Sequence, residues 1–244
     1  MSEPKGHAYR RRVRAGGLAG FAVRVEQTDL FVRASRDMTD ETYDLVRRGR
    51  ERIESWAAGR PEFLTSLHPL PSNRLAPSPV REMLEAGRTA GVGPMAAVAG
   101  ALAEFVGLRL IPASPEGVIV ENGGDVFLQT ADPVTIGLFA GVSKLSLRLG
   151  LRIEPRDMPA GVCTSSGRLG HSLSLGRADA ATVVGASAAL ADAAATALGN
   201  RVREVREIEP ALEWVLSLEG VRGAAVVLGD RLGFLGDLDL VALG

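Results

Sequence analysis

The chain contains a single cysteine and almost no net charge, and each of these absences excludes a class of protein. Cys163 is the only cysteine among 244 residues, so neither an internal disulfide nor a multi-cysteine zinc site can form. Lys and Arg number 28 and Asp and Glu 29, so the net charge of −1 does not favour nucleic acid or an anionic membrane as a partner. The one local basic cluster, at residues 10–14, is typical of a solvated chain end.

Long hydrophobic runs and aromatic residues are also scarce. The longest apolar run, Pro94 to Val106, has 13 residues and contains Glu104, whereas a helix needs about 20 residues to cross a bilayer. Residues 1–20 lack the apolar core of a signal peptide. Aromatic residues make up only 5% of the chain, which contains 29 glycines, so close backbone packing is expected rather than bulky anchors. We therefore expect a cytoplasmic globular protein that has no membrane-spanning segment.

Local residue patterns predict strands in runs, with helices grouped between them. Five prolines between 60 and 79 indicate an ordered wrap or a linker. Helices are predicted at residues 39–58, 79–90, 94–107, 187–199 and 209–218. Strands are predicted at 20–26, 30–34, 108–111, 118–121, 125–129, 135–140, 145–153, 160–165, 178–185, 223–229 and 232–242. This order favours an α+β fold with a mixed or antiparallel sheet, and no internal repeat is visible.

Two glycine-containing turns are candidates for ligand binding. GVGPMA, residues 91–96, matches a loose dinucleotide loop, but a predicted helix precedes it where a true loop follows a strand. A tight turn into a helix that begins at Pro94 is the simpler interpretation, and its free N–H groups could still bind an anion. ENGGDV, residues 121–126, is typical of a hairpin turn. Because both of its flanks are apolar, Asp125 is also expected at a buried strand end, where a carboxylate needs partners or a ligand.

The segment GVCTSSGRLGH, residues 161–171, gathers hydroxyl and glycine residues in one turn. Hydroxyls and free N–H groups together can hold an anion or the edge of a flavin. Cys163 and His171 suggest a nucleophile and its base, but their spacing fits no known signature, and a free cysteine is commonly just buried. A serine hydrolase is less favoured, because the G-x-S-x-G elbow is missing.

The alanine-rich stretch SAALADAAATALGN, residues 187–200, places a carboxylate and a hydroxyl one helical turn apart. Asp192 and Thr196 share one helix face, with Cβ atoms about 5–6 Å apart. If the pair faces water, it is an ordinary polar face. If it faces inward, it forms the hard-oxygen side of a Mg²⁺ or Ca²⁺ site, and such ions combine few protein ligands with substrate phosphates. The spacing alone leaves both possibilities open.

Taken in order, these segments resemble the ApbE superfamily, whose known members are FAD:protein FMN transferases. The counterparts are GPMAAVAGALAE at 93–104, ENGGDV at 121–126, CTSSG at 163–167, His171 and ADAAATAL at 191–198. The chain looks still more like a short branch of that superfamily, in which VGPMAAVAG, ENGGD, SSG-x-x-GHS and ADAAAT run together. The resemblance implies a single T-fold-like α+β domain over residues 1–244, with the motifs in about 90–200.

The resemblance also implies roles for individual residues. Asp192 and Thr196 would ligate Mg²⁺ with a backbone carbonyl near Ala96, and the ion would bridge the pyrophosphate of FAD. Asp192 and His171 are the implied catalytic residues. The residues implied to line the flavin pocket are Gly93, Asn122, Gly123, Gly124, Asp125, Thr164, Ser165, Ser166 and Gly167.

The sequence departs from the transferases at two points. Ala99, Gly100 and Ala101 stand where they have Lys-Gly-Tyr, and His171 is not followed by their Asp-Pro-x-Thr-Gly. Loss of a cation and an acid can remove chemistry while sparing binding. Three functions therefore stay open: a Mg²⁺-dependent flavin-nucleotide transferase or pyrophosphatase, a non-catalytic ligand-binding protein, and an accessory factor in sulfur assimilation with Cys163 as sulfur carrier. The expected partners are a nucleotide, an acceptor protein and further copies of the chain.

Overall fold

A computed structural model describes residues 17–166 and 176–243 of the chain. Its main feature is an eight-stranded sheet in the order β1-β2-β3-β4-β7-β8-β9-β10, in which every neighbouring pair is antiparallel. A second, three-stranded antiparallel sheet has the order β11-β6-β5. The strands are β1 (Ala19–Val25), β2 (Thr28–Ala34), β3 (Gly117–Asn122), β4 (Asp125–Thr130), β5 (Val134–Gly137), β6 (Leu149–Ile153), β7 (Ala160–Ser165), β8 (Ala180–Gly185), β9 (Val221–Leu228), β10 (Arg231–Gly236) and β11 (Asp239–Ala242).

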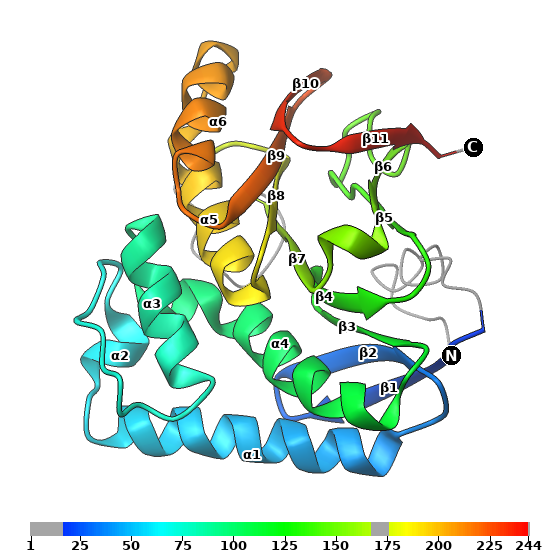
Figure 1. Cartoon of the computed structure of the whole chain (residues 1–244). Coiled ribbons are helices and arrows are strands. Elements are labelled where there is room, and N and C mark those ends of the chain that lie inside the picture. Colours follow the sequence, from blue (N-terminus) through cyan, green and yellow to red (C-terminus); the bar gives the residue numbers. More distant parts are fainter. Residues whose placement is uncertain (1–16, 167–175, 244) are drawn as a thin grey trace.

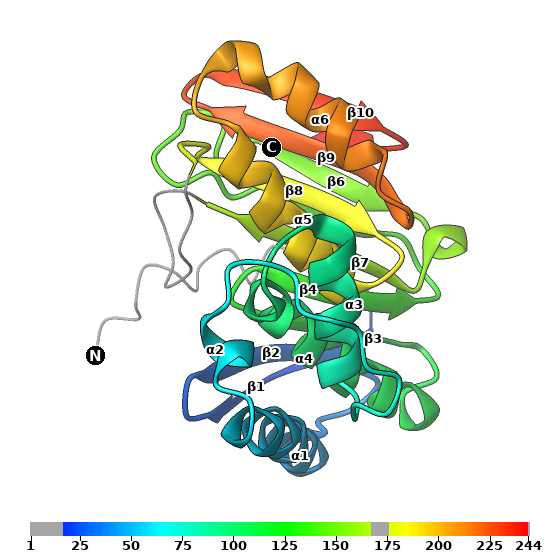
Figure 2. The same cartoon turned by 90° about the vertical axis from the view of Figure 1, so that its left-hand side faces the viewer.

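The large sheet separates two layers, and the helices cover one of its faces (Figures 1 and 2). α4 and α5 lie against the middle strands, α6 against β9 and β10, and α1 against α4 and β1. The helices are α1 (Thr39–Ala58), α2 (Glu62–Thr65), α3 (Val80–Ala90), α4 (Val98–Leu110), α5 (Ala188–Arg201) and α6 (Ile208–Leu216), with short 3-10 helices η2 (Pro94–Ala97), η3 (Ile111–Ala113), η4 (Pro155–Asp157) and η5 (Val205–Glu207).

The second sheet covers the opposite face of the large one. Leu128 and Val162 on the large sheet pack with Ile136, Leu151 and Ile153 on the small sheet in one buried cluster. The helical face forms a larger cluster that includes much of α4 and α5. Apolar residues on both faces of β3, β4, β7 and β8 explain why these strands read as continuous apolar runs rather than alternating ones.

The order of elements occurs twice along the chain. β1 and β2 are followed by helices and then by β3 and β4, and β7 and β8 are followed by α5, α6, β9 and β10. The two halves join where β4 pairs with β7, with Val126 opposite Val162. This repeated order is a finding of the structure, because no internal repeat is visible in the sequence.

Two predicted strands are wrong as elements, and two others are too long: β5 ends at Gly137 rather than 140, and β6 begins at Leu149 rather than 145. The strand predicted at 108–111 is the end of α4 followed by η3. Gly107 suggests a helix end, but the helix continues to Leu110, and the glycine serves close packing, since a side chain there would overlap the ring of Phe127. The strand predicted at 232–242 is two strands, β10 and β11, which belong to different sheets.

The apolar helix of the core is longer than the sequence run suggested. Pro94–Ala113 is a helical stretch of 20 residues that is long and apolar enough to cross a membrane by length and composition. The 13-residue apolar run therefore underestimates the length of this helical stretch. Within the fold this stretch is packed against α1, α5 and the strands β3 and β4, and Ala103, Phe105 and Val106 are buried. These contacts are those of a central core helix.

Candidate functional site

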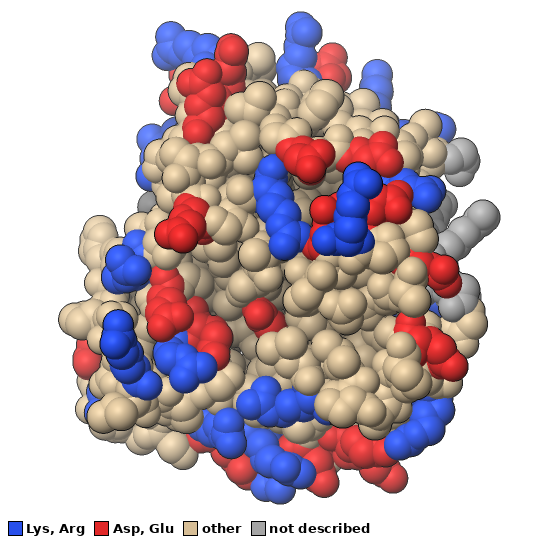
Figure 3. Space-filling view, in the orientation of Figure 1, with Lys and Arg blue, Asp and Glu red and all other residues tan. Residues whose placement is uncertain are grey.

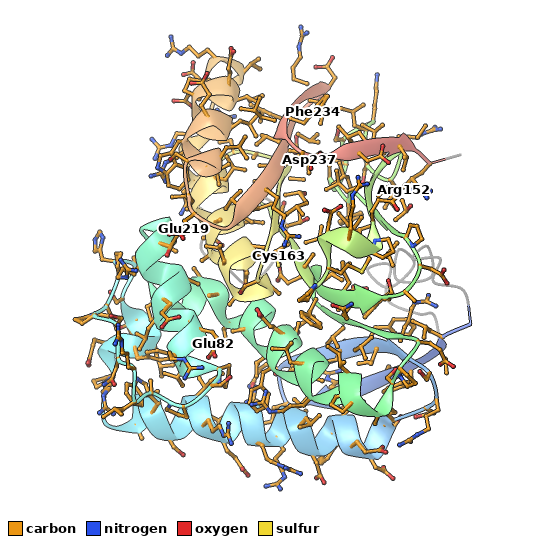
Figure 4. All side chains as sticks on the ribbon, in the orientation of Figure 1. Glu82, Arg152, Cys163, Glu219, Phe234 and Asp237 are labelled. Atoms are coloured by element: carbon orange, nitrogen blue, oxygen red, sulfur yellow. The ribbon has the colours of Figure 1, made fainter. Side chains whose placement is uncertain are left out.

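The predicted site residues that the structure describes lie at η2, the β3–β4 turn, the end of β7 and α5. The last three meet where β4 pairs with β7, a junction that we call the seam, and η2 packs against α5. The β3–β4 turn and the end of β7 lie side by side through the pairing of β4 with β7, and α5 packs across both strands and α4. Cys163, on β7, is labelled in Figure 4 beside α5. Gly123 and Gly124 adopt φ of 64° and 113°, conformations that favour glycine, and no atom occupies the space where their side chains would stand.

Close backbone packing sets the position of α5. A Cβ on Gly100 of α4 would overlap the carbonyl oxygen of Ala188 and stand 2.9 Å from the Cβ of Asp192. A Cβ on Gly161 of β7 would overlap the Cα of Ala188 from another side. The first residue of α5 is thus held between two glycines, and the scarcity of bulky side chains in this region allows that approach.

One peptide group of α4 is held from two sides by predicted site residues. The N–H of Gly100 donates to Oδ2 of Asp192 at 2.9 Å. The carbonyl of Ala99, in the same peptide group, accepts from Nδ2 of Asn122 at 3.1 Å. The β3–β4 turn and α5 therefore both bind the first turn of α4, although they are far apart in the sequence.

The start of α5 receives a carboxylate in return. Oε2 of Glu104, on α4, accepts from the Ser187 hydroxyl at 2.7 Å and from the N–H of Ala189 at 3.2 Å. The Ser187 hydroxyl in turn accepts from the N–H of Leu190, so it is the N-cap of the helix. Burial raises the pKa of Glu104 above its ordinary range, although these hydrogen bonds oppose the shift.

Two carboxylates and one thiol of the seam affect one another's protonation. Burial raises the pKa of Asp125 to about 7, with a further rise from the charge of Glu121, while bonds from Cys163 and the Thr164 N–H lower it. Burial and then the charge of Asp125 raise the pKa of Asp192 well above its usual range. Burial and both carboxylates likewise raise the pKa of Cys163. The charge of Asp125 therefore opposes ionisation of Asp192 and Cys163, and the charge of Asp192 opposes ionisation of Cys163.

The remaining predicted residues divide between those near the seam and those outside the described residues. Thr164 shares a 2.9 Å hydrogen bond with Thr182 of β8, and Ser165 and Ser166 are half-buried at the end of β7. Thr196 is half-buried one turn beyond Asp192 on α5. Gly93 directly precedes η2 and Ala96 lies within it, and η2 packs against α5. Gly167 and His171 lie in 167–175, outside the described residues.

The donor set of the seam suits a hard divalent cation. A carboxylate, a hydroxyl and a backbone carbonyl are oxygen ligands of the kind that Mg²⁺ prefers, and a cation beside Asp125 and Asp192 would offset their mutual repulsion. In residues 17–166 and 176–243, no three His, Cys, Asp or Glu side chains are grouped to hold a metal. The predicted set contains only one such side chain, so that finding does not bear on it.

Three surface cavities, of about 390, 340 and 210 Å³, are lined by residues outside the predicted flavin set. The first two are rich in arginine and acids, and acidic and basic side chains also alternate on the face in Figure 3. Arg152 and Asp237, labelled in Figure 4, line the 340 Å³ cavity near the small sheet. None of these three cavities is lined by the predicted flavin-binding residues, so the case for a site at the seam depends on its hydrogen bonds and charges.

Sequence reasoning missed Glu104 and Ser187 as parts of this region. Glu104 is the one charge within the apolar run 94–106, and an acid within an apolar helix is a signal for a buried polar contact. Ser187 precedes the alanine-rich helix, where an N-cap is expected. The partnership itself joins residues 83 positions apart and has no local signal.

The fold defines the class of protein. It is similar to the Thermotoga maritima ApbE protein, with a TM-score of 0.59 and 10% identity over 88% of this chain and 96% of that one. It is also similar to the Pseudomonas stutzeri flavinyl transferase ApbE, with a TM-score of 0.54 and 14% identity over 90% and 94% of the two chains. At such identities the likeness establishes the ApbE-like α+β fold, and this confirms the predicted fold class.

The family follows from the sequence comparisons. The family model described as AbpE bacteria matches residues 10–228, and the chain belongs to that family. It is 41% identical over 206 residues to a UPF0280 protein of Methanocella arvoryzae, covering 82% of this chain and 84% of that protein. It is 42% identical over 200 residues to a UPF0280 protein of Methanocaldococcus jannaschii, covering 80% and 81% of the two chains. The identification as an ApbE-like branch is thereby confirmed.

Proposed function

We propose that the chain binds FAD together with a divalent cation at the seam between β4 and β7, and that it acts on the pyrophosphate of the nucleotide. The observation that carries this proposal is the pair of carboxylates, Asp125 and Asp192, whose repulsion a bound cation would relieve. The ApbE-like fold and the family membership support the choice of a flavin nucleotide as the ligand.

The chain's own residues orient the ligand and the ion. Asp192 and Thr196, with the carbonyl of Ala96, would hold the cation, and Mg²⁺ would supply Lewis-acid stabilisation of the pyrophosphate charge. A carboxylate has about four lone-pair sites, so Asp192 can accept from Gly100 and still bind an ion. The open glycine turn at 123–124 and the hydroxyls of 164–166 face the nucleotide in this proposal.

The reaction is a displacement at phosphorus. An oxygen of an acceptor protein's hydroxyl, or of water, forms a bond to the FMN phosphorus, and the bridging P–O bond breaks. AMP leaves with the bridging oxygen, and the proton of the attacking hydroxyl or water is released to solvent. With a protein acceptor the product is a flavinylated protein, and with water it is free FMN. His171 stays a predicted participant, because it lies outside the described residues.

The test is to mix the purified protein with FAD, desalt it with and without Mg²⁺, and record the visible spectrum and any AMP released. We expect a flavin band that needs Mg²⁺ and is lost in Asp192→Asn, with AMP formed only by the unmodified chain. Asp230→Asn is the matched control, because its carboxylate is 84% exposed and lies away from the seam. Failure to retain flavin under either condition would refute the proposal.

A second candidate is a protein that binds the nucleotide without turning it over. The observation in its favour is that Ala99 and Ala101 replace the Lys and Tyr of the transferases, so the first turn of α4 offers no cation to a leaving phosphate. Metal-dependent flavin retention with no AMP would support this candidate.

The role of Cys163 as a sulfur carrier is disfavoured. Its side chain is fully buried, its S–H lies 3.4 Å from the Ala188 carbonyl, and its pKa is raised by burial and by neighbouring carboxylates. A sulfur carrier needs an accessible thiolate.

A further inference from the structure

A carboxylate from each of the helices α4 and α5 accepts hydrogen bonds from the start of the other helix. Asp192, four residues after Ala188 on α5, accepts from the N–H of Gly100 on α4. Glu104, four residues after Gly100 on α4, accepts from the N–H of Ala189 and the hydroxyl of Ser187 at the start of α5. Each helix thus provides the carboxylate that satisfies free N–H groups at the start of the other.

The two contacts share one close approach of the backbones. Gly100 contacts Ala188 directly, and a side chain at Gly100 would overlap the Ala188 carbonyl oxygen. The Glu104 contact lies on one side of this approach and the Asp192 contact on the other. A shift that lengthens the Glu104 contact therefore also moves Ala188 relative to Gly100, and the Asp192 side chain moves with its helix.

We infer that Glu104 is a positioning residue for Asp192: by holding the start of α5 to α4, it fixes the orientation of the Asp192 carboxylate. The link between the two acids stands on the hydrogen bonds alone, and its consequence for a bound cation rests on the proposed function. Asp192 is then held on one side by Gly100, which leaves its remaining oxygen lone pairs in a fixed direction.

The alternative is that Glu104 only caps α5 locally. Both roles predict that Glu104→Ala loosens the start of α5, so loss of stability does not separate them. They differ at Gly100, which lies on α4 outside the cap of α5, and whose N–H donates to Asp192 rather than to Glu104. The exchange rate of the Gly100 amide proton is therefore the informative readout.

The experiment measures amide hydrogen exchange by NMR in the full-length chain, without metal or flavin. The variants are Glu104→Ala and Glu104→Gln, since a glutamine oxygen can still accept from Ser187 and Ala189. In Glu104→Ala we expect the Ala189 amide to exchange roughly tenfold faster or more, and the Gly100 amide at least about threefold faster. In Glu104→Gln both amides stay near their original rates, and the amides of β3 report global unfolding in every sample.

Unchanged exchange at Gly100 in Glu104→Ala, with faster exchange at Ala189, would overturn the inference and leave a local cap. If Glu104→Ala does not fold, Ser187→Ala provides the same test, because it removes the hydroxyl that donates to Glu104. A parallel titration with FAD and Mg²⁺ should show weaker binding in Glu104→Ala and recovery in Glu104→Gln. Absence of FAD binding by the unmodified chain would refute the proposed function but leave the exchange result intact.

Discussion

Replacing Asp125 with Asn should change how the stability of the protein depends on pH. The pKa of Asp125 is raised from its ordinary value of 3.8 to about 7, chiefly by burial. A carboxyl group whose pKa is higher in the folded state stabilises that state below its unfolded pKa. That contribution is lost as the pH rises through the folded pKa. The free energy of unfolding should therefore fall between about pH 4 and about pH 7.

The size of the effect follows from the pKa. A tenfold change in proton affinity corresponds to about 1.4 kcal/mol, so a rise from 3.8 to about 7 amounts to about 2–4 kcal/mol once residual solvent screening is considered. Asp125→Asn removes this contribution and also the charge that raises the pKa of Asp192. We expect the variant to match the unmodified protein near pH 4 and to exceed its stability at pH 8.

Urea denaturation at intervals between pH 4 and pH 8 measures this difference. Asp230→Asn is the control, because a carboxylate that is 84% exposed should leave the pH profile unchanged. Parallel profiles for the unmodified protein and Asp125→Asn would refute the reasoning. A variant whose loss of stability is largest at high pH would also refute the reasoning, because it would mean that the ionised form of Asp125 stabilises the folded state.

Three further outcomes follow from the packing and burial of the seam. Gly100→Ala should lower the free energy of unfolding, measured by urea denaturation, by about 2–4 kcal/mol, because the new methyl group overlaps the Ala188 carbonyl. Gly59→Ala is the control and should have little effect, because the space around Gly59 is open. Equal effects of the two substitutions would contradict the close packing at Gly100. Asn122→Ala should cost about 1 kcal/mol of stability and weaken flavin retention, because the Ala99 carbonyl loses its partner; retention as strong as in the unmodified protein would show that the turn does not face the nucleotide. Cys163 should react with a thiol reagent at pH 8 at least about a hundredfold more slowly in the folded protein than in urea, because it is buried and its pKa is raised; rapid labelling of the folded protein would reopen its role as a sulfur carrier.

Local signals predicted those parts of the fold that depend on local chemistry. The Asn-Gly-Gly-Asp turn requires positive φ at two residues, and the structure has a hairpin there with Gly123 and Gly124 in such conformations. The helix predicted at 39–58 matches α1, because Val46, Gly49 and Ile53 form a buried face with helical spacing. The strands predicted at 20–26 and 30–34 match β1 and β2 for the same kind of reason, since Phe21 and Val23 alternate with exposed residues.

The boundaries that failed depend on tertiary packing. α4 is buried on most sides, so its apolar residues show little periodicity, and Gly107 serves contact with Phe127 rather than a helix end. β10 and β11 were predicted as one strand, because nothing local shows that the chain passes from one sheet to the other after Gly236.

The candidate site was only partly accessible from the sequence. The motifs located Asn122, Asp125 and Asp192. In the structure Asn122 and Asp192 form hydrogen bonds with the first turn of α4, and the charge of Asp125 raises the pKa of Asp192. Glu104 was missed because its partners lie 83 and 85 residues away. The role of His171, the metal ligands, the cytoplasmic location and the association of copies stay predictions.

The most direct measurement of the central claim is the affinity for FAD, by titration with flavin fluorescence, with and without Mg²⁺, for the unmodified chain and for Asp192→Asn. Asn can still accept the Gly100 N–H bond, so the variant removes the charge while keeping the contact between the helices. We expect Mg²⁺ to strengthen FAD binding by about tenfold or more in the unmodified chain and to have no effect in the variant. FAD binding that is equally tight without Mg²⁺, or that keeps its Mg²⁺ dependence in Asp192→Asn, would contradict a metal-linked nucleotide site at this seam.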